Sequence, residues 1–283
     1  IIDLYGADAI QIISRNPYQL AFDVRGIGFL KADKIASSIG IEPDSPERIK
    51  AAMIYVLNIA SEGGHCYRTE LQLTNALLEL LGLSDSQLNK SLEECYKGLE
   101  DFGSIVVTKS IDEKNKIIYL TEFYDAELEV AKRVAQLYRT TFNIDKVRVS
   151  DWLQRYTQAA QLELSDQQIN AIIRSAATKC FVLTGGPGVG KTTTVNAIIR
   201  LAKAMGRSVV LAAPTGRAAQ RMSEVSGGEQ AQTIHRLLEW GPEGFGRNED
   251  NPLVADTIVV DEASMLDIKL TASLLKAVSS HTQ

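Results

Sequence analysis

The sequence has few of the residues that build disulfide frameworks and metal centres. Its 283 residues include three histidines and three cysteines, and Cys66, Cys95 and Cys180 are widely spaced with no C-x-x-C pair. An odd number of separated cysteines is typical of reduced thiols and not of a disulfide framework or a zinc site. His65 beside Cys66 has no partners with which to complete a metal site. We therefore expect a cytoplasmic protein with reduced thiols.

Long apolar runs are also missing. No stretch approaches the roughly 20 apolar residues that a membrane-spanning helix needs, and no signal peptide is visible. The composition, with 45% hydrophobic and 23% charged residues, is that of a globular protein, and we expect no membrane partner. The length predicts about two domains. Because the first residue is Ile and not Met, we expect the chain to be cut from a longer protein.

An excess of positive charge is absent as well. The net charge is −5, and residues 1–125 carry 12 Lys and Arg against 19 Asp and Glu, whereas residues 126–283 carry 18 against 16. This excludes a protein that coats DNA through a general positive field. Any contact with nucleic acid must come from local patches and backbone amides.

Residues 185–192 read Gly-Gly-Pro-Gly-Val-Gly-Lys-Thr and fit the phosphate-binding P-loop pattern G-x-x-x-x-G-K-[ST]. The preceding residues 179–184 predict a short buried strand, and residues 193–205 predict a helix. A glycine-rich turn between strand and helix directs backbone N–H groups and the positive end of the helix dipole at one point, which suits phosphate. The predicted nucleotide-binding residues of this turn are Gly186, Pro187, Gly188, Val189, Gly190, Lys191, Thr192 and Thr193.

Two side chains of this loop have separate predicted tasks. Lys191 is expected to reach the β- and γ-phosphates, and the Thr192 hydroxyl is expected to ligate Mg²⁺. The alternative is a glycine-rich turn that binds nothing.

A second acidic element supports the P-loop. The apolar residues 257–260 end in Asp261-Glu262, 70 residues after Lys191, which matches a Walker B element. Asp261 is predicted to hold Mg²⁺, mostly through water, and Glu262 to polarise the attacking water. Asp-Glu after an apolar strand is common by itself, and the upstream P-loop makes the pair specific.

Another strand-to-helix turn follows the predicted strand 208–213. It contains Pro214, Thr215, Gly216 and Arg217, which would lie at the carboxyl edge of a parallel sheet, where such folds bind ligands. These residues are candidates to hold a phosphate of a nucleic-acid strand. The alternative is a solvated arginine at the start of a helix.

Two further features are weaker. Thr233 is predicted to cap a helix with His235 in its first turn, although a lone histidine is more often structural. Gln168 is able to hydrogen-bond an adenine edge. It also forms a predicted capping box with Ser165 at the start of helix 166–176, so two roles compete for one side chain.

Near the beginning of the chain, two short predicted helices, 17–24 and 29–39, are joined by Arg25-Gly26-Ile27-Gly28. They resemble the helix-hairpin-helix motif, in which glycines let backbone N–H groups approach a DNA phosphate. Gly26 and Gly28 are the predicted DNA contacts, and Lys31 adds charge. The second helix is expected to bury Leu30, Ile35, Ala36 and Ile39. A plain helical hairpin is the alternative.

The next region predicts a winged-helix-like module. Helices begin at the Ser45 cap and at the capping boxes of Thr69 with Gln72 and Ser84 with Gln87. A hairpin of strands 104–109 and 116–120 follows. Because the region is acidic, a scaffold or protein-contact role is favoured over DNA reading. Helices predicted at 124–141 and 151–161 lead to the P-loop region.

Four of these motifs together carry a family resemblance. Residues 185–192, 213–219, 233–235 and 260–265 resemble motifs I, Ia, Ib and II of superfamily 1 helicases. The motif sequences Ala-Pro-Thr-Gly-Arg-Ala-Ala and Asp-Glu-Ala-Ser-Met are similar to those of the RecD-like branch. This branch includes the exodeoxyribonuclease V alpha chain and the RecD/TraA helicases. The N-terminal hairpin and helical module resemble the extension of the stand-alone RecD-like helicases.

The resemblance implies a DNA-dependent ATPase that moves 5′ to 3′ along single-stranded DNA in recombination or repair. It implies ATP and Mg²⁺ as cofactors. Single-stranded DNA, duplex DNA ends and other recombination or repair proteins are the implied partners. Adenine would be contacted by Gln168, and catalysis would rest on Lys191, Asp261 and Glu262. The implied strand contacts are Pro214, Thr215, Gly216, Arg217, Thr233 and His235.

The implied fold class is α/β. A RecA-like P-loop NTPase domain with a parallel sheet is preceded by a mainly α N-terminal region with helix-hairpin-helix and winged-helix-like modules. The predicted domains are a helix-hairpin-helix region at 1–43, a winged-helix-like module at 44–123, bridging helices at 124–162, and a first motor domain at 163–283, truncated after motif II.

The family also needs a second RecA-like domain, with an arginine that is worth roughly 10³- to 10⁵-fold in rate in comparable NTPases. We therefore expect this chain by itself to bind nucleotide weakly and not to unwind DNA. The competing hypothesis is a non-motor P-loop ATP switch or a DNA-binding adaptor. A nucleotide kinase lacks support, because no arginine cluster typical of a lid follows the P-loop.

Overall fold

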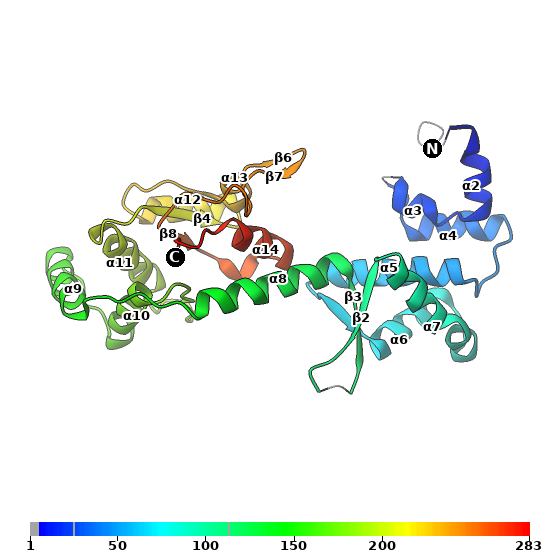
Figure 1. Cartoon of the computed structure of the whole chain (residues 1–283), viewed down its shortest axis with the longest axis horizontal. Coiled ribbons are helices and arrows are strands. Elements are labelled where there is room, and N and C mark those ends of the chain that lie inside the picture. Colours follow the sequence, from blue (N-terminus) through cyan, green and yellow to red (C-terminus); the bar gives the residue numbers. More distant parts are fainter. Residues whose placement is uncertain (1–5, 25, 113) are drawn as a thin grey trace. The chain divides into compact units, whose positions relative to one another are not determined.

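The computed structural model describes residues 6–24, 26–112 and 114–283. The chain divides into two compact units, Ile1–Asp125 and Ala126–Gln283, each described here by itself (Figure 1). The first unit contains η1 (Gly6–Asp8), α2 (Ala9–Arg15), α3 (Gln19–Asp23), α4 (Phe29–Ser38), α5 (Pro46–Glu62), β1 (Tyr67–Thr69), α6 (Glu70–Leu81), α7 (Asp85–Asp101), β2 (Ile105–Lys109) and β3 (Lys116–Leu120). Helix α8 (Thr121–Tyr138) continues into the second unit.

The helical hairpin of α3 and α4 is present, with Arg25 outside the described residues. Asn16 accepts a hydrogen bond from the Tyr18 N–H. Because Pro17 and Tyr18 form a turn, α3 begins at Gln19, two residues later than predicted. The predicted burial of Leu30 and Ile39 is wrong, since they are 53% and 46% exposed. Helix α4 buries Ala36 as predicted, and it also turns Phe29 and Ala32 inward.

The module from α5 to β3 has winged-helix topology. Its sheet is antiparallel in the order β1-β3-β2, and its helices bury Ile49, Met53, Leu77 and Leu88 in one core. Both predicted capping boxes at the starts of α6 and α7 are present. Cap chemistry is local, which is why the sequence predicted these boundaries well.

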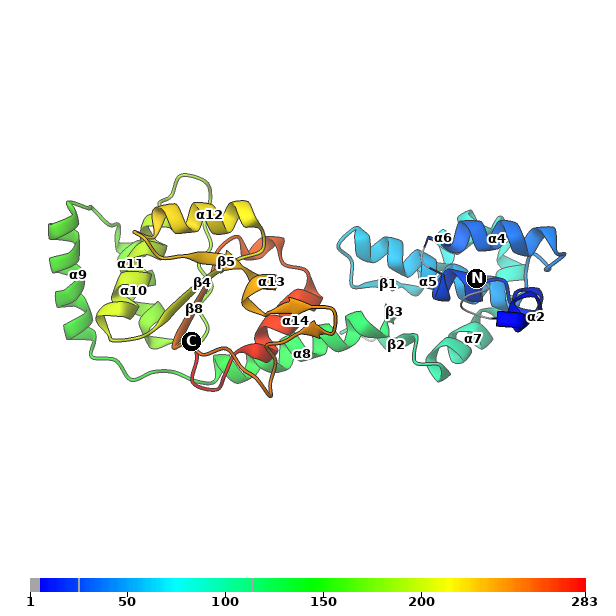
Figure 2. The same ribbon diagram turned by 90° about the horizontal axis from the view of Figure 1, so that it is seen from above.

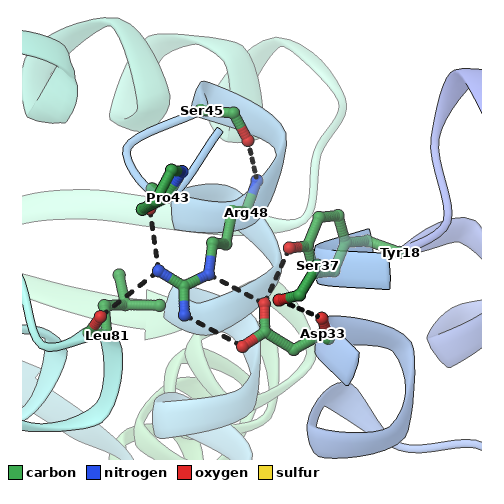
Figure 3. A network of polar contacts seen from close by, with 7 residues as sticks. All are labelled: Tyr18, Asp33, Ser37, Pro43, Ser45, Arg48 and Leu81. Atoms are coloured by element: carbon green, nitrogen blue, oxygen red, sulfur yellow. Dashed lines mark hydrogen bonds and ion pairs between the residues drawn. The ribbon is translucent and has the colours of Figure 1, made fainter. Parts of the chain in front are cut away.

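A polar network ties the helical hairpin to this module (Figure 3). Arg48 of α5 forms two parallel hydrogen bonds to the Asp33 carboxylate of α4, at 2.8 and 2.9 Å, and the Tyr18 hydroxyl donates to the same carboxylate at 2.7 Å. The guanidinium also donates to the carbonyls of Pro43 and Leu81. One arginine thereby links α5 to α4, to the connection before α5 and to the end of α6.

The second unit is a three-layer α/β/α fold. It contains α9 (Lys146–Ala160), α10 (Asp166–Ala177), α11 (Lys191–Ala204), β4 (Val209–Ala213), α12 (Gly216–Val225), β5 (Ala231–Thr233), α13 (Ile234–Leu237), β6 (Trp240–Gly241), β7 (Gly244–Phe245), β8 (Thr257–Val260), η2 (Ala263–Met265) and α14 (Ile268–Ala277). The central sheet is parallel, as predicted for a P-loop domain. Its strand order, β5-β4-β8, did not follow from the sequence.

Successive side chains along each strand point to opposite faces of this sheet. Leu211 packs with Ile199 of α11 and Met222 of α12. Its neighbour Ala212 packs on the opposite face with residues of α13 and α14. Figure 2 shows α12 on one side of the strands and α14 on the other. This arrangement leaves the carboxyl ends of the strands free for loops.

The predicted strand at residues 179–184 is wrong. Val182 is 80% exposed, and this stretch has no strand partner among the described residues. The free edge of β8 is instead met by the last residue: the Ile258 N–H donates to the Gln283 carbonyl, and the Gln283 N–H donates to the Asp256 carbonyl. Residues 179–184 lie outside the ladders of the described sheet.

Other differences are smaller. Helix α8 begins three residues before the predicted position and α9 five residues before it. The three-residue strand β5 and the β6–β7 hairpin were not predicted from the sequence. None of the helices that the structure describes is long and apolar enough to span a membrane.

Candidate nucleotide and nucleic-acid sites

The P-loop lies directly before α11. Gly188 and Gly190 have φ values of +77° and +80°, a left-handed conformation that glycine adopts without strain. Gly190 is the N-cap of α11 and Thr194 is the first residue whose N–H bonds back to it. The N–H groups of Lys191, Thr192 and Thr193 find no acceptor in the described part of the chain. Such a helix start suits a phosphate group.

The Lys191 ammonium is held at this loop. It donates to the carbonyls of Gly185 and Gly186, each at 2.7 Å. A side chain on Gly185 would place its Cβ 2.9 Å from Val189 Cγ2, so the loop is closed tightly around the lysine. The cation and the free N–H groups therefore stand in the same small region, and these residues fit a triphosphate.

Gln168 forms the predicted capping box of α10 and also contacts the P-loop. Its Oε1 accepts the Ser165 N–H at 2.8 Å in the capping box of α10. Its Nε2 lies 3.4 Å from the carbonyls of Val189 and Gly190. A single amide thus caps α10 and contacts the P-loop, and its adenine contact stays a prediction.

Asp261 and Glu262 follow β8, and Pro214 to Arg217 follow β4. Because these strands are parallel neighbours, both turns lie at one carboxyl edge. A pocket of about 470 Å³ is lined by Thr215, Arg217, Asp261 and Glu262. The structure therefore brings the predicted motif Ia and motif II side chains together.

Glu262 is held in an unusual backbone conformation. Its φ and ψ are 52° and 38°, a left-handed region that non-glycine residues seldom adopt and that concentrates at functional sites. Its N–H is bonded to the Asp261 carboxylate at 2.9 Å. The sharp turn exposes the Glu262 side chain beyond the strand end.

Thr233 and His235 lie at the same sheet edge, since Thr233 pairs with Ala213 of β4. The Thr233 side chain caps α13 by accepting the Arg236 N–H, as predicted. The His235 ring lies against aromatic rings of the β6–β7 hairpin. Its centroid is 6.2 Å from that of Trp240 and 5.8 Å from that of Phe245. The hairpin contact was not visible in the sequence pattern.

Gly26, Gly28 and Lys31 belong to the other unit and form a separate candidate site. Gly26 has φ +91°, and neither glycine has an atom within 4 Å of an added Cβ. Lys31 donates to the Gly26 carbonyl at 2.9 Å. The turn is therefore open to a ligand on the side where its glycines lie.

The donor set available for a metal is small. No group of three or more His, Cys, Asp or Glu side chains that could hold a metal occurs among the described residues. The hydroxyl of Thr192 and the carboxylate of Asp261 are oxygen donors of the kind that Mg²⁺ prefers. Mg²⁺ commonly takes one or two protein ligands and completes its shell with phosphates and water. Thr192 and Asp261 thus supply donors of the right type for a metal that nucleotide would bring.

Two residues at this edge were missed by the sequence analysis. Arg221 and Met265 line the same pocket as Arg217 and Glu262. Arg221 follows Arg217 by four residues, a spacing that places both on one helix face. This spacing was the signal in the sequence that could have found it.

Comparisons with known proteins agree with this geometry. Residues 168–283 match the AAA domain family, and residues 1–67 match the family described as ATP-dependent RecD2 DNA helicase HHH domain. The chain is 35% identical over 278 residues to the ATP-dependent RecD2 DNA helicase of Deinococcus radiodurans, covering 97% of this chain and 38% of that protein.

Two other relatives match shorter stretches. The RecBCD enzyme subunit RecD of Haemophilus influenzae is 27% identical over 237 residues, with 74% of this chain and 34% of that protein covered. The ATP-dependent DNA helicase dda of Enterobacteria phage T4 is 36% identical over 129 residues, with 41% and 29% covered. The chain thus spans little more than a third of the length of the first two relatives. The match over 97% of the chain, with a RecD2 helicase family at one end and the AAA family at the other, shows that the chain belongs to the RecD-like helicase family.

Proposed function

We propose that the protein is an ATP-dependent DNA helicase or translocase that moves 5′ to 3′ along single-stranded DNA in recombination or repair. The observation that carries the proposal is the single pocket that holds Thr215 and Arg217 beside Asp261 and Glu262. Residues suited to a nucleic-acid phosphate and residues suited to nucleotide hydrolysis share one sheet edge. A change in the position of one set of side chains is therefore expected to shift the other set.

Each residue of the nucleotide site has a role in this proposal. The free N–H groups at the start of α11 and the Lys191 ammonium bind the phosphates. Thr192 and Asp261 hold Mg²⁺, which neutralises phosphate charge when it is bound. Glu262 accepts a proton from the attacking water. Gln168 contacts adenine. Because its Nε2 also contacts the P-loop carbonyls, binding of phosphate to the loop is expected to change the position of its side chain.

The proposed DNA contacts fall in both units. Pro214 to Arg217, Thr233 and His235 contact the single strand at the sheet edge. Gly26, Gly28 and Lys31 contact the backbone of duplex ends through the open turn of the helical hairpin. Helix α7 carries five acidic residues against two lysines, so the winged-helix-like module offers a surface to other recombination or repair proteins and not to DNA.

The test is ATP hydrolysis with and without single-stranded DNA, measured on the protein encoded by the gene that contains this chain. We expect stimulation by DNA that disappears in Lys191→Ala and persists in Lys90→Ala, an exposed lysine of α7. Glu262→Gln should still bind ATP while its turnover falls by about 10²- to 10⁴-fold. Nucleotide binding without DNA-dependent turnover would contradict the motor and favour a P-loop switch or adaptor. Strand displacement on substrates with one single-stranded arm then gives the direction.

A further inference from the structure

The outer face of α12 carries two arginines at the edge of the nucleotide site. Arg217 and Arg221 are both exposed, and both line the pocket that also contains Gln220 and Met265. No ion pair or hydrogen bond occupies either guanidinium within the part of the chain that the structure describes. The two cations are therefore available to a ligand.

The pocket also contains the carboxylates of Glu224, Asp261 and Glu262, and among the described residues no ion pair joins any of them to either arginine. Glu224 accepts a hydrogen bond from the Gln220 amide at 3.1 Å. Asp261 accepts the N–H of Glu262. Both arginines thus lie beside these carboxylates without forming an ion pair, and their donors remain open to a phosphate.

The spacing of the pair suits a chain of phosphates. Residues four apart on a helix face the same way and are separated by about 6 Å along the axis. A single phosphate at the start of α12 would need only the N–H groups there and Arg217. A second arginine one turn further matches a ligand with a second negative charge further along the helix. Met265, 59% exposed in the same pocket, offers apolar surface to a sugar or a base.

We propose that Arg221 is a second phosphate contact for a single nucleic-acid strand that runs along α12, beyond the contact predicted for Arg217. The inference rests on the proposed function, because it places the strand at the edge where ATP is hydrolysed. Arg221 acts through its charge and its position on α12 and takes no part in hydrolysis.

The test is the salt dependence of binding to a fluorescent oligothymidylate, measured by anisotropy without nucleotide. Each phosphate contact to a single strand contributes about 0.7 to the slope of log K against log salt. We expect Arg221→Ala to reduce the slope by about that amount and Arg221→Lys to preserve it, because the charge remains. Arg155→Ala, an exposed arginine of α9 outside the pocket, should leave the slope unchanged.

Two outcomes separate the failure of this inference from failure of the proposed function. If the unaltered protein binds the strand and Arg221→Ala keeps the full slope, the second contact is wrong and the helicase proposal stands. If the unaltered protein does not bind single strands at all, both are wrong. Because Arg221 is exposed, its substitution should leave the melting temperature unchanged, which circular dichroism checks.

Discussion

Arg48 is the residue on which the attachment of α4 to α5 depends (Figure 3). Its side chain and that of Asp33 are 13% and 19% exposed. Removing one partner of a largely buried pair leaves the other charge uncompensated. We expect Arg48→Met to destabilise the first unit by about 3 kcal/mol, measured by urea denaturation. The matched control is Lys34→Met, an exposed residue of the same helix as Asp33, which should change little. An equal loss in both variants would contradict the role of the network.

The same network predicts a pH dependence. Burial raises the pKa of Asp33, but the hydrogen bonds from Arg48 and Tyr18 outweigh it and hold the pKa below its usual value of 3.8. A carboxyl whose pKa is lowered in the folded state stabilises the fold above its unfolded pKa, and this stability is lost as pH falls through the folded pKa.

Denaturation of the unaltered protein and of Asp33→Asn between pH 3 and pH 6 measures this contribution. The stability difference between the two should be constant above about pH 5 and should shrink as the pH falls below 4. A stability difference that stays the same down to pH 3 would show that ionisation of Asp33 does not stabilise the folded state and that its pKa is not lowered on folding.

At the scale of the element, the start of α10 joins helix capping to the nucleotide site. Ser165 and Gln168 form the capping box, but only Gln168 also reaches the P-loop carbonyls. We expect Ser165→Ala and Gln168→Ala each to cost about 1 kcal/mol of stability. Only Gln168→Ala should also weaken binding of a fluorescent ATP analogue. Equal nucleotide affinity in the two variants would reduce Gln168 to a capping residue.

The elements also show what the sequence was able to predict. The boundaries of α5, α6, α7 and α10 follow from caps and periodicity, which depend on residues close in the chain. Strands depend on partners far away in the chain, and residues 179–184 read as a strand although they pair with no strand in the described part of the structure. The exposure of Leu30 has the same origin, because a periodic pattern does not reveal which helix faces have a neighbour.

The candidate site divides in the same way. Lys191, Thr192, Asp261 and Glu262 belong to compact motifs, so the sequence named them without a fold. Arg221 lies outside any motif. Its spacing from Arg217 indicates a shared helix face, but its place beside Asp261 and Glu262 follows only from the pairing of β4 with β8. The left-handed backbone of Glu262 was equally hidden, since nothing in its residue type requires it.

At the scale of the whole molecule, the two units have separate hydrophobic cores. One core is built from α4 to β3 and includes Leu88, and the clusters of the P-loop unit include Leu211. Because no buried cluster draws on both sets of residues among those described, we expect two thermal transitions in calorimetry. Leu88→Ala should lower the temperature of one transition and Leu211→Ala that of the other. Each should reduce the unfolding free energy of its unit by about 2 to 5 kcal/mol, as is typical of such core substitutions.

Nucleotide identifies which transition is which. A ligand that binds only the folded state stabilises the unit that holds it, by about 2.7 kcal/mol at a hundredfold excess over Kd. ATP with Mg²⁺ should therefore raise only the transition that Leu211→Ala lowers. Lys191→Ala should abolish the shift while leaving both transitions in place without ligand. A single transition that both core substitutions move would instead mean that the two units fold as one cooperative body. In that case α8, which is shared between them, would carry stability from one to the other.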